Sequence, residues 1–569
     1  MPDPKTAIDV AYFSMEIMLE TDIPNYAGGL GVLAGDLLRS CADTRTSAVG
    51  VSLIYSGKFM KQIVHPDGSQ EFEERDWQKS DQLTQLPNQV KVELDGVEAV
   101  IGCWRYDIVG LDGFVVPVYL LDLDLMENPQ WIREITQNLY DSSQGHFRIC
   151  QEVVLGIGGI KMLRDLGYQD IKTYHINEGH GAFALLELLA ERGYQDDAVR
   201  KSCVFTTHTP MPEGHDRFAY DFAYKYAGKY LPWHIRKLAG DDCLNMTLLG
   251  INLSHTSLAV SQKHRKVTEH LFPGFHFEYV TNGIHARSWV GSYFQDLFER
   301  YLPGWLEDPS LLKDAVEKLP DDVLWHVHKE SKNELVTYVN KHMPNVLPYV
   351  GYEMKPWDYF DTHTLTISLA RRPVAYKRPL LIYKDIERLA RIGAGKIQII
   401  QCGRSSPHDA ISQDFIHQII EISNRLRGVM KIAFLENYSP KIARQLVCGT
   451  DVWLNTPRRP LEASGTSGMK AAANGVLNFS VLDGWWIEGY QMDPLSGFAI
   501  GPSDERVEPD NNDDADAMDL YDKLESEIVP LYYDRRPEWI SRMKHAITLA
   551  AHFNTHRVLA EYKSKAWNI

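Results

Sequence analysis

The sequence lacks several features that mark special classes of protein. Its seven cysteines are scattered through 569 residues without a CxxC pair. This spacing argues against a disulfide framework or a compact zinc site and predicts reduced thiols in the core. No apolar run is long enough to cross a bilayer, and the N-terminal MPDPKTAIDVAYF lacks the pattern of a signal sequence. We therefore expect a cytoplasmic protein.

Positive charge is also scarce. The formal net charge of −17 argues against nucleic acid or an anionic membrane as the main partner. Any anion site must therefore be a local cluster of basic residues. The content of 44% apolar and 24% charged residues is ordinary for a globular protein, and the length predicts two or three domains. The acidic stretch from Asp504 to Asp519 is predicted to be an exposed loop leading into a helix.

Repeats and low-complexity linkers are absent, and strand and helix signals alternate instead. In the second half, helical patterns at 379–393 and 410–428 separate short β-rich runs. These runs are LTISLA (365–370), KIQIIQC (396–402), KIAFLE (431–436), DVWLN (451–455) and VLNFSVL (476–482). The first half repeats the pattern more loosely, with TYHIN, the helical AFALLELLAERG, SCVFTTH and FEYVTN. Buried strands alternating with helices predict the α/β class with parallel, doubly wound sheets.

This alternation predicts two Rossmann-like lobes facing a central cleft, with ligands at the carboxyl ends of the strands. The boundary is expected between Thr281 and Trp289, which gives lobes 1–284 and 285–569. The helical region around 538–551, near the C-terminus, is a candidate to cross the boundary and pack against the first lobe.

The stretch RRPLEASGTSGMKAAANGVL places Lys470 after a loop of small residues and at the start of an Ala-rich helix. Such a loop exposes backbone N–H groups, and the helix dipole adds positive potential, so the stretch suits a phosphate. A flexible turn followed by a solvated lysine is the alternative from this stretch alone.

Two further loops are candidates to bind anions. Gly29, Gly31 and Ala34 in GGLGVLAG match a weak G-x-G-x-x-A pattern, but no strand runs directly into the turn and no ribose-binding acid is evident. An anion at the helix N-terminus and a plain tight turn both remain open. ARRPVAYKRP (370–379) carries four cations within eight residues after a strand. It could grip phosphate oxygens from two sides or form a solvated basic turn.

Histidines His180, His208 and His215 also follow strand signals. They form no HExxH or other compact ligand set, so no metal site is expected. Core histidines and contacts with sugar hydroxyls both remain open.

The segment EASGTSGMK (462–470) is similar to the pyridoxal-phosphate lysine motif of the α-glucan phosphorylases, which usually reads EASGTGNMK; seven of nine positions agree. ENYS, VTNGI, THTPMPE and GGLGVLA occur in the order typical of the same family. The chain thus resembles glycogen, starch and maltodextrin phosphorylases, and especially their short bacterial and archaeal forms. This resemblance implies the GT-B glycosyltransferase architecture of two facing lobes.

The resemblance implies a role for each matching residue at the cofactor. Lys470 matches the lysine that forms a Schiff base with pyridoxal 5′-phosphate, and Tyr438 matches the tyrosine beside the cofactor. Arg371 stands where the family usually has a lysine that reaches the cofactor phosphate. The loop that holds this phosphate is matched by Gly465, Thr466 and Ser467.

A second set of matches concerns the substrates. Arg372 and Lys377 match the residues that hold the substrate phosphate, joined by the backbone N–H of Gly29. His208 matches the histidine whose backbone carbonyl faces the anomeric carbon. The residues that bond the glucose hydroxyls are matched by Asn282, Tyr376, Glu462 and Ser464, and Glu178 and His180 align with an acid and a histidine near the sugar.

This family also accounts for the missing pair of catalytic carboxylates that ordinary glycosidases use. The resemblance implies phosphorolysis of α-1,4-glucan from the non-reducing end, with retention and release of glucose 1-phosphate. In such enzymes the substrate phosphate protonates the leaving oxygen, and the cofactor assists through its phosphate and not its ring. Two phosphates held side by side require several cations, for which Arg371, Arg372 and Lys377 are candidates.

The chain also departs from the family pattern. Only about ten residues precede YFSMEI, so we expect no phosphorylation or nucleotide control of the animal type. Val374 and Ala375 replace polar residues, Gly468 replaces an asparagine, and TPRRP (456–460) replaces an unrelated stretch. These changes leave the preferred glucan length and the affinity for phosphate open. A homodimer is expected by resemblance.

Two alternatives remain at this point. A nucleotide-sugar-dependent glucan synthase of the same fold would need a nucleotide diphosphate site and no lysine-bound cofactor, so Lys470 within its motif disfavours it. A catalytically inactive glucan-binding protein is disfavoured because the two phosphate sites retain their cations.

Overall fold

The computed structural model describes residues 7–57, 59–75, 77, 79, 82–140, 145–343, 353–502, 506, 509 and 511–569. Its contacts divide the chain into two compact units. Unit 1 contains residues 1–59, 76–285 and 555–569, and unit 2 contains residues 60–75 and 286–554. The chain therefore passes between the units more than once, and each unit is assembled from segments far apart in the sequence.

Unit 1 is built on a nine-stranded sheet with the order β13-β12-β9-β8-β1-β2-β7-β6-β5. All neighbours from β13 to β7 are parallel, and β6 and β5 add an antiparallel edge. The strands are β1 (Ile8–Phe13), β2 (Ala48–Leu53), β5 (Thr84–Leu94), β6 (Val97–Val109), β7 (Val115–Asp122), β8 (Ile171–Asn177), β9 (Cys203–Thr206), β12 (Thr256–Ala259) and β13 (Glu278–Tyr279). A short ribbon of β10 (Arg217–Ala219) and β11 (Cys243–Asn245) lies apart from this sheet.

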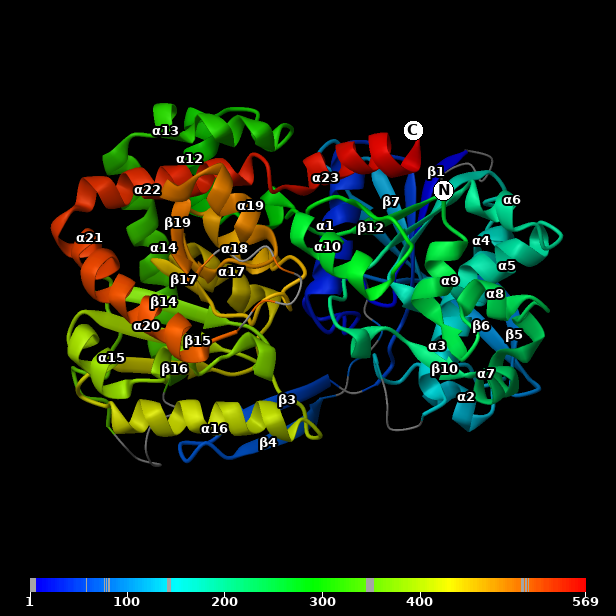
Figure 1. Ribbon diagram of the computed structural model, residues 1–569, viewed down its shortest axis with the longest axis horizontal. Coiled ribbons are helices and arrows are strands. Elements are labelled where there is room, and N and C mark those ends of the chain that lie inside the picture. The colour runs from blue at the N-terminus through cyan, green and yellow to red at the C-terminus, as the bar shows by residue number, and fades with distance from the viewer. Residues whose placement is uncertain are drawn as a thin grey trace. The chain divides into compact units, whose positions relative to one another are not determined.

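Helices cover both faces of this sheet (Figure 1). The central strand β1 shows why: Ala11 and Phe13 pack into one core cluster, whereas Val10 and Tyr12 pack into another. Alternate side chains thus enter opposite cores, which explains why β1 is apolar along almost its whole length. The main helices are α1 (Gly29–Asp43), α3 (Phe147–Val153), α4 (Gly159–Asp165), α5 (Phe183–Glu191), α7 (Tyr220–Ala227), α9 (Met246–Asn252), α10 (Gln262–Leu271) and α23 (Thr555–Tyr562).

Unit 2 contains a six-stranded parallel sheet with the order β16-β15-β14-β17-β18-β19. The strands are β14 (Leu365–Ala370), β15 (Ile397–Cys402), β16 (Lys431–Leu435), β17 (Val452–Asn455), β18 (Leu477–Val481) and β19 (Gly497–Ile500). The strand order reverses between β14 and β17, so their carboxyl ends flank a topological switch point, where α/β sheets bind ligands. The predicted α/β class with parallel sheets in two lobes is confirmed.

The helices of unit 2 connect these strands and pack against the sheet. The main ones are α12 (Ser292–Tyr301), α14 (Asp321–His342), α15 (Ile386–Gly393), α16 (Ala410–Arg425), α17 (Pro440–Gly449), α18 (Thr466–Ala472), α19 (Trp485–Met492), α20 (Asp513–Lys523), α21 (Val529–Asp534) and α22 (Arg536–Ala550). The acidic stretch does lead into a helix, α20, but residues 504, 505, 507, 508 and 510 of the predicted exposed loop lie outside the described residues. No helix among the described residues is long and apolar enough to span a membrane.

A hairpin from the first half of the sequence belongs to unit 2. Its strands are β3 (Phe59–Val64) and β4 (Gln70–Arg75), and it lies beside α16 (Figure 1). Gln62 donates its backbone N–H to Asn437 Oδ1 at 2.8 Å and accepts from Asn437 Nδ2 at 2.7 Å. This hairpin therefore borders the ENYS motif, although the two are far apart in the sequence.

Candidate active site

The strongest cluster of charge among the predicted site residues lies at the carboxyl ends of β14 and β17. Arg371 directly follows β14, and Glu462 lies in the loop between β17 and α18. Lys377 Nζ donates to both carboxylate oxygens of Glu462, at 2.8 and 2.7 Å. Arg371 Nη1 lies 3.4 Å from Glu462 Oε2. The structure thus brings together a predicted cofactor residue, a predicted phosphate residue and a predicted sugar residue.

The charges in this cluster keep the Glu462 carboxylate ionised and leave the cluster with a net positive charge. Burial raises the pKa of Glu462, but Lys377 and Arg371 oppose it and hold that pKa below its usual value. Two cations against one carboxylate leave a formal charge of +1. Nε and Nη1 of Arg371 are buried without a hydrogen-bond partner. Such donors need an acceptor, so the cluster is suited to an oxyanion.

Arg372 is not part of this cluster. Its side chain is 69% exposed, and Nη2 donates to Asp409 Oδ2 at 2.8 Å. Asp409 is the N-cap of α16, where its Oδ1 accepts the backbone N–H of Ser412. The predicted contact of Arg372 with the substrate phosphate stays a prediction and requires Arg372 to exchange Asp409 for that phosphate.

Lys470 lies within helix α18 and is only 7% exposed. Its Nζ lies 3.7 Å from the ring centroid of Trp289, over the aromatic face. Gly465 caps the helix with φ +88°, a left-handed conformation that favours glycine. Lys470 is therefore a buried group, in contrast to the solvated lysine that the sequence left open.

The loop before α18 is equally enclosed. Ser464 Oγ is buried without a hydrogen-bond partner, and Ser467 Oγ accepts the indole N–H of Trp453 at 3.1 Å. Gly484 lies so close that a Cβ there would stand 2.5 Å from the carbonyl oxygen of Ser464. The backbone carbonyl of Tyr376 accepts the backbone N–H of Arg458 at 2.7 Å, which links the basic loop to the TPRRP stretch.

Two departures from the family motif have structural explanations. A Cβ on Gly468 would lie 2.4 Å from Asn478 Oδ1 and 3.0 Å from the ring of Trp485, so this chain has no room for the asparagine typical of the family. In the TPRRP stretch, Arg459 donates to Asp516 at 3.0 Å, and Asp516 also binds the buried Arg378 at 2.7 Å. This buried network anchors both loops that carry the charge cluster.

In unit 1, Glu178 follows β8 and His208 follows β9, neighbouring strands of the sheet. Glu178 Oε2 accepts the backbone N–H of His208 at 2.7 Å, and Thr209 Oγ1 donates to the same oxygen at 3.0 Å. The ring of His208 bonds Asn177 Oδ1 at 2.7 Å. Glu178 therefore fixes the backbone at His208, and it adopts φ +76° to do so.

Among the other predicted residues of unit 1, His180 and Asn282 are buried and keep unused polar atoms, whereas Gly29 is exposed. His180 Nδ1 and Asn282 Oδ1 are buried without hydrogen-bond partners. His180 Nε2 lies 3.6 Å from Asp216 Oδ2. A Cβ built on Gly29 would meet no protein atom within 4 Å. His215 is also a buried histidine: its Nδ1 bonds Thr247 Oγ1 at 2.9 Å, and its Nε2 is likewise buried without a hydrogen-bond partner.

Burial lowers the pKa of His180 and His208 to about 3, so both rings are neutral at pH 7. Tyr438 packs partly buried against a core cluster of unit 2, where it follows the Asn437 that the β3–β4 hairpin holds.

Sequence reasoning missed Glu16, which holds the glycine loop. Glu16 is 2% exposed, and its Oε2 accepts the N–H groups of Ala27 at 2.6 Å and Gly28 at 3.2 Å. Tyr140 donates to the other oxygen at 2.9 Å. A signal was present, because Glu16 follows the carboxyl end of β1 within YFSMEI, but its partners lie 11 and 124 residues away.

Comparison with known proteins agrees with this arrangement. Residues 234–526 match the family described as carbohydrate phosphorylase. The chain is 37% identical to a maltodextrin phosphorylase from Thermococcus litoralis, over 99% of this chain and 71% of that one. It is 34% identical to a glycogen phosphorylase from Aquifex aeolicus, over 98% of this chain and 86% of that one. The chain therefore belongs to the carbohydrate phosphorylase family.

Proposed function

We propose that this enzyme phosphorolyses α-1,4-glucan from the non-reducing end, with retention, and releases glucose 1-phosphate. The observation that carries the proposal is the largely buried cluster of Arg371, Lys377 and Glu462 at the switch point of unit 2, in which Glu462 is the first residue of the Lys470 motif. Its spare positive charge suits phosphate, and its carboxylate suits a sugar hydroxyl. The names of the relatives, maltodextrin phosphorylase and glycogen phosphorylase, support the same substrate class.

The proposed cofactor is pyridoxal 5′-phosphate, and the residues present fit it. Lys470 is buried and would anchor the group, with the face of Trp289 already against its Nζ. The unpartnered Nε of Arg371 and Oγ of Ser464 are donors that a phosphate would satisfy. Gly465, Thr466, Ser467 and Tyr438 are proposed to line the same site. When bound, the cofactor supplies an acidic phosphate that assists the reaction electrostatically.

The chain's own residues would divide the remaining work. Lys377 holds the substrate phosphate, with Arg372 joining after it leaves Asp409 and the Gly29 N–H adding a neutral donor. One carboxylate oxygen of Glu462 would then release Lys377 and accept a hydrogen bond from a glucose hydroxyl. This exchange lets two anions approach without leaving either cation unpaired.

Unit 1 would bind the sugar. Glu178 holds the backbone of His208, whose carbonyl would face the anomeric carbon, and Asn282 Oδ1 and His180 Nδ1 offer unused atoms for hydroxyls. Tyr376 and Ser464 would complete the glucose contacts. We also propose that residues 1–284 form mainly the glucan side and 285–569 the cofactor side of a cytoplasmic homodimer.

Phosphorolysis of a ladder of maltooligosaccharides, with pyridoxal content measured on the same sample, tests the proposal. We expect phosphate-dependent release of glucose 1-phosphate and about one pyridoxal phosphate per chain. A nucleotide-sugar-dependent synthase would ignore phosphate and require a nucleotide sugar. An inactive binding protein would retain maltodextrin but release no glucose 1-phosphate.

A further inference from the structure

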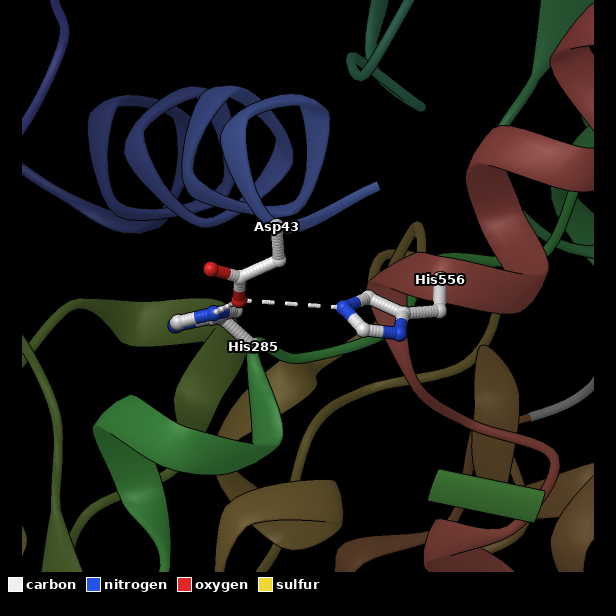
Figure 2. Close-up of side chains that lie close together, drawn as sticks. All are labelled: Asp43, His285 and His556. Atoms are coloured by element: carbon white, nitrogen blue, oxygen red, sulfur yellow. Dashed lines mark hydrogen bonds and ion pairs between the residues drawn. The ribbon is translucent and has the colours of Figure 1, made fainter. Parts of the chain in front are cut away.

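Outside the candidate active site, three side chains of unit 1 converge on one point. They are Asp43 at the end of α1, His285 at the last residue before the chain enters unit 2, and His556 in α23. Figure 2 shows both imidazole rings directed at the same carboxylate. Among the residues that the structure describes, this is the one group of three metal-ligating side chains whose donor atoms all lie within 4.8 Å of one another.

The carboxylate of Asp43 is within hydrogen-bond distance of only one of the two histidines. His285 Nε2 lies 2.7 Å from Asp43 Oδ2, a hydrogen-bond distance. His556 Nε2 lies 3.8 Å from the same oxygen, too far for a hydrogen bond although its ring is aimed there. Ligand atoms around a tetrahedral ion with bonds of about 2.0 Å stand about 3.3 Å apart, between these two values.

The supporting residues hold the donors in place. Asp43 Oδ1 accepts the backbone N–H of Leu111 at 3.0 Å, which leaves Oδ2 to face the histidines. The backbone N–H of His285 donates to Asp36 Oδ2 at 3.2 Å. Such contacts orient ligands in metal sites. The donor side chains of Asp43, His285 and His556 are only 3%, 6% and 14% exposed.

We propose that Asp43 Oδ2, His285 Nε2 and His556 Nε2 bind a divalent transition-metal ion of the zinc class, with a fourth position left to water. Two histidines and one carboxylate are ligands that zinc accepts in this number. This metal would be structural, since none of the three residues belongs to the proposed catalytic machinery.

The position of the cluster indicates what the ion would do. The chain leaves unit 1 after His285 and returns at Thr555. Thr555 already joins these segments, since its N–H donates to Ile284 O at 2.9 Å and its Oγ1 lies 2.6 Å from Ser40 Oγ. Helix α23 packs along α1 (Figure 1). The ion would fasten α1 and α23 to the point where the chain leaves unit 1.

The test uses the full-length holoenzyme without a histidine tag, stripped with EDTA and titrated with Co²⁺ while its visible absorption is followed. We expect one equivalent to bind with a d–d spectrum, and Zn²⁺ to displace it and raise the melting temperature. His556→Gln and Asp43→Asn should each weaken binding at least tenfold and remove the thermal shift. Because a buried Asp43→Asn change could impair folding, His556→Gln with circular dichroism is the decisive variant.

His234→Gln is the matched control. His234 also lies in unit 1, is 16% exposed and pairs with Asp196 at 2.9 Å. It should bind Co²⁺ as the unmodified chain does. If the unmodified chain shows no saturable binding, or if His556→Gln binds as tightly as His234→Gln, the cluster is only a hydrogen-bonded group and the proposal is wrong.

Discussion

The contact between Lys377 and Glu462 gives the most quantitative test of the proposed site. At distances of 2.7 and 2.8 Å, and an effective dielectric constant of about 20, the Coulomb attraction is about 6 kcal/mol. Desolvation of both ions removes several kcal/mol of this attraction. The two side chains remain 15% and 12% exposed, and Arg371 still faces Glu462 at 3.4 Å. We therefore expect Lys377→Met to destabilise unit 2 by about 2–3 kcal/mol.

A double-mutant cycle isolates this interaction from other effects of the substitutions. Glu462→Gln keeps the shape of the side chain but removes its charge, and the double variant should recover much of the loss. We expect a coupling energy of about 2 kcal/mol. The measurement is urea unfolding of the four proteins, following the transition that reports on unit 2. A coupling energy below about 0.5 kcal/mol would mean that the pair is only a weak surface contact and would refute the electrostatic reasoning.

Other consequences can be tested independently. Arg372→Ala should leave the melting temperature almost unchanged, because the Arg372 side chain is 69% exposed. It should raise the KM for phosphate at least tenfold, about 1.4 kcal/mol; an unchanged KM would mean that the arginine never reaches the substrate. Gly468→Asn should cost about 1–3 kcal/mol of stability through contact with Asn478 and Trp485, so a variant that melts like the unmodified protein would contradict the steric explanation. The free energy of unfolding should decrease as the pH is lowered. His180 and His208 have pKa values of about 3 in the folded protein and about 6.5 in the unfolded chain, so the unfolded chain is protonated at a higher pH than the folded protein. Between about pH 7.5 and 5.5 each histidine should cost about 1.4 kcal/mol of stability, and urea midpoints that do not change would show that these rings are accessible to solvent.

The sheet of unit 2 was the part of the fold that the sequence predicted best. Its first five strands were predicted from short β-rich runs because both faces of each strand are buried, which leaves continuous apolar segments. β19 was missed, since GFAI is short and its pairing with β18 is a long-range property. The hairpin of residues 59–75 was also missed, because its assignment to unit 2 depends on contacts with residues more than 340 positions away.

Motifs placed the candidate site, but they did not give its geometry. The motif around Lys470 predicted a ligand-binding lysine, and the structure adds its burial against Trp289. The pairing of Lys377 with Glu462 joins two motifs 85 residues apart, which spacing alone cannot reveal. The resemblance assigns Arg372 and Lys377 together to the substrate phosphate, but only Lys377 contacts Glu462 in the structure. Arg372 meets Asp409, so its contact with phosphate stays a prediction.

We propose that a pyridoxal phosphate held at Lys470 is required for phosphorolysis. Borohydride reduction of the purified holoenzyme, followed by peptide mapping, tests it most directly, with Lys470→Ala measured for absorbance and turnover alongside. We expect a pyridoxyl label on Lys470 alone and a variant that has neither the cofactor absorbance nor glucose 1-phosphate release. A label on another lysine, or a cofactor-free variant that still phosphorolyses maltodextrin, would contradict it.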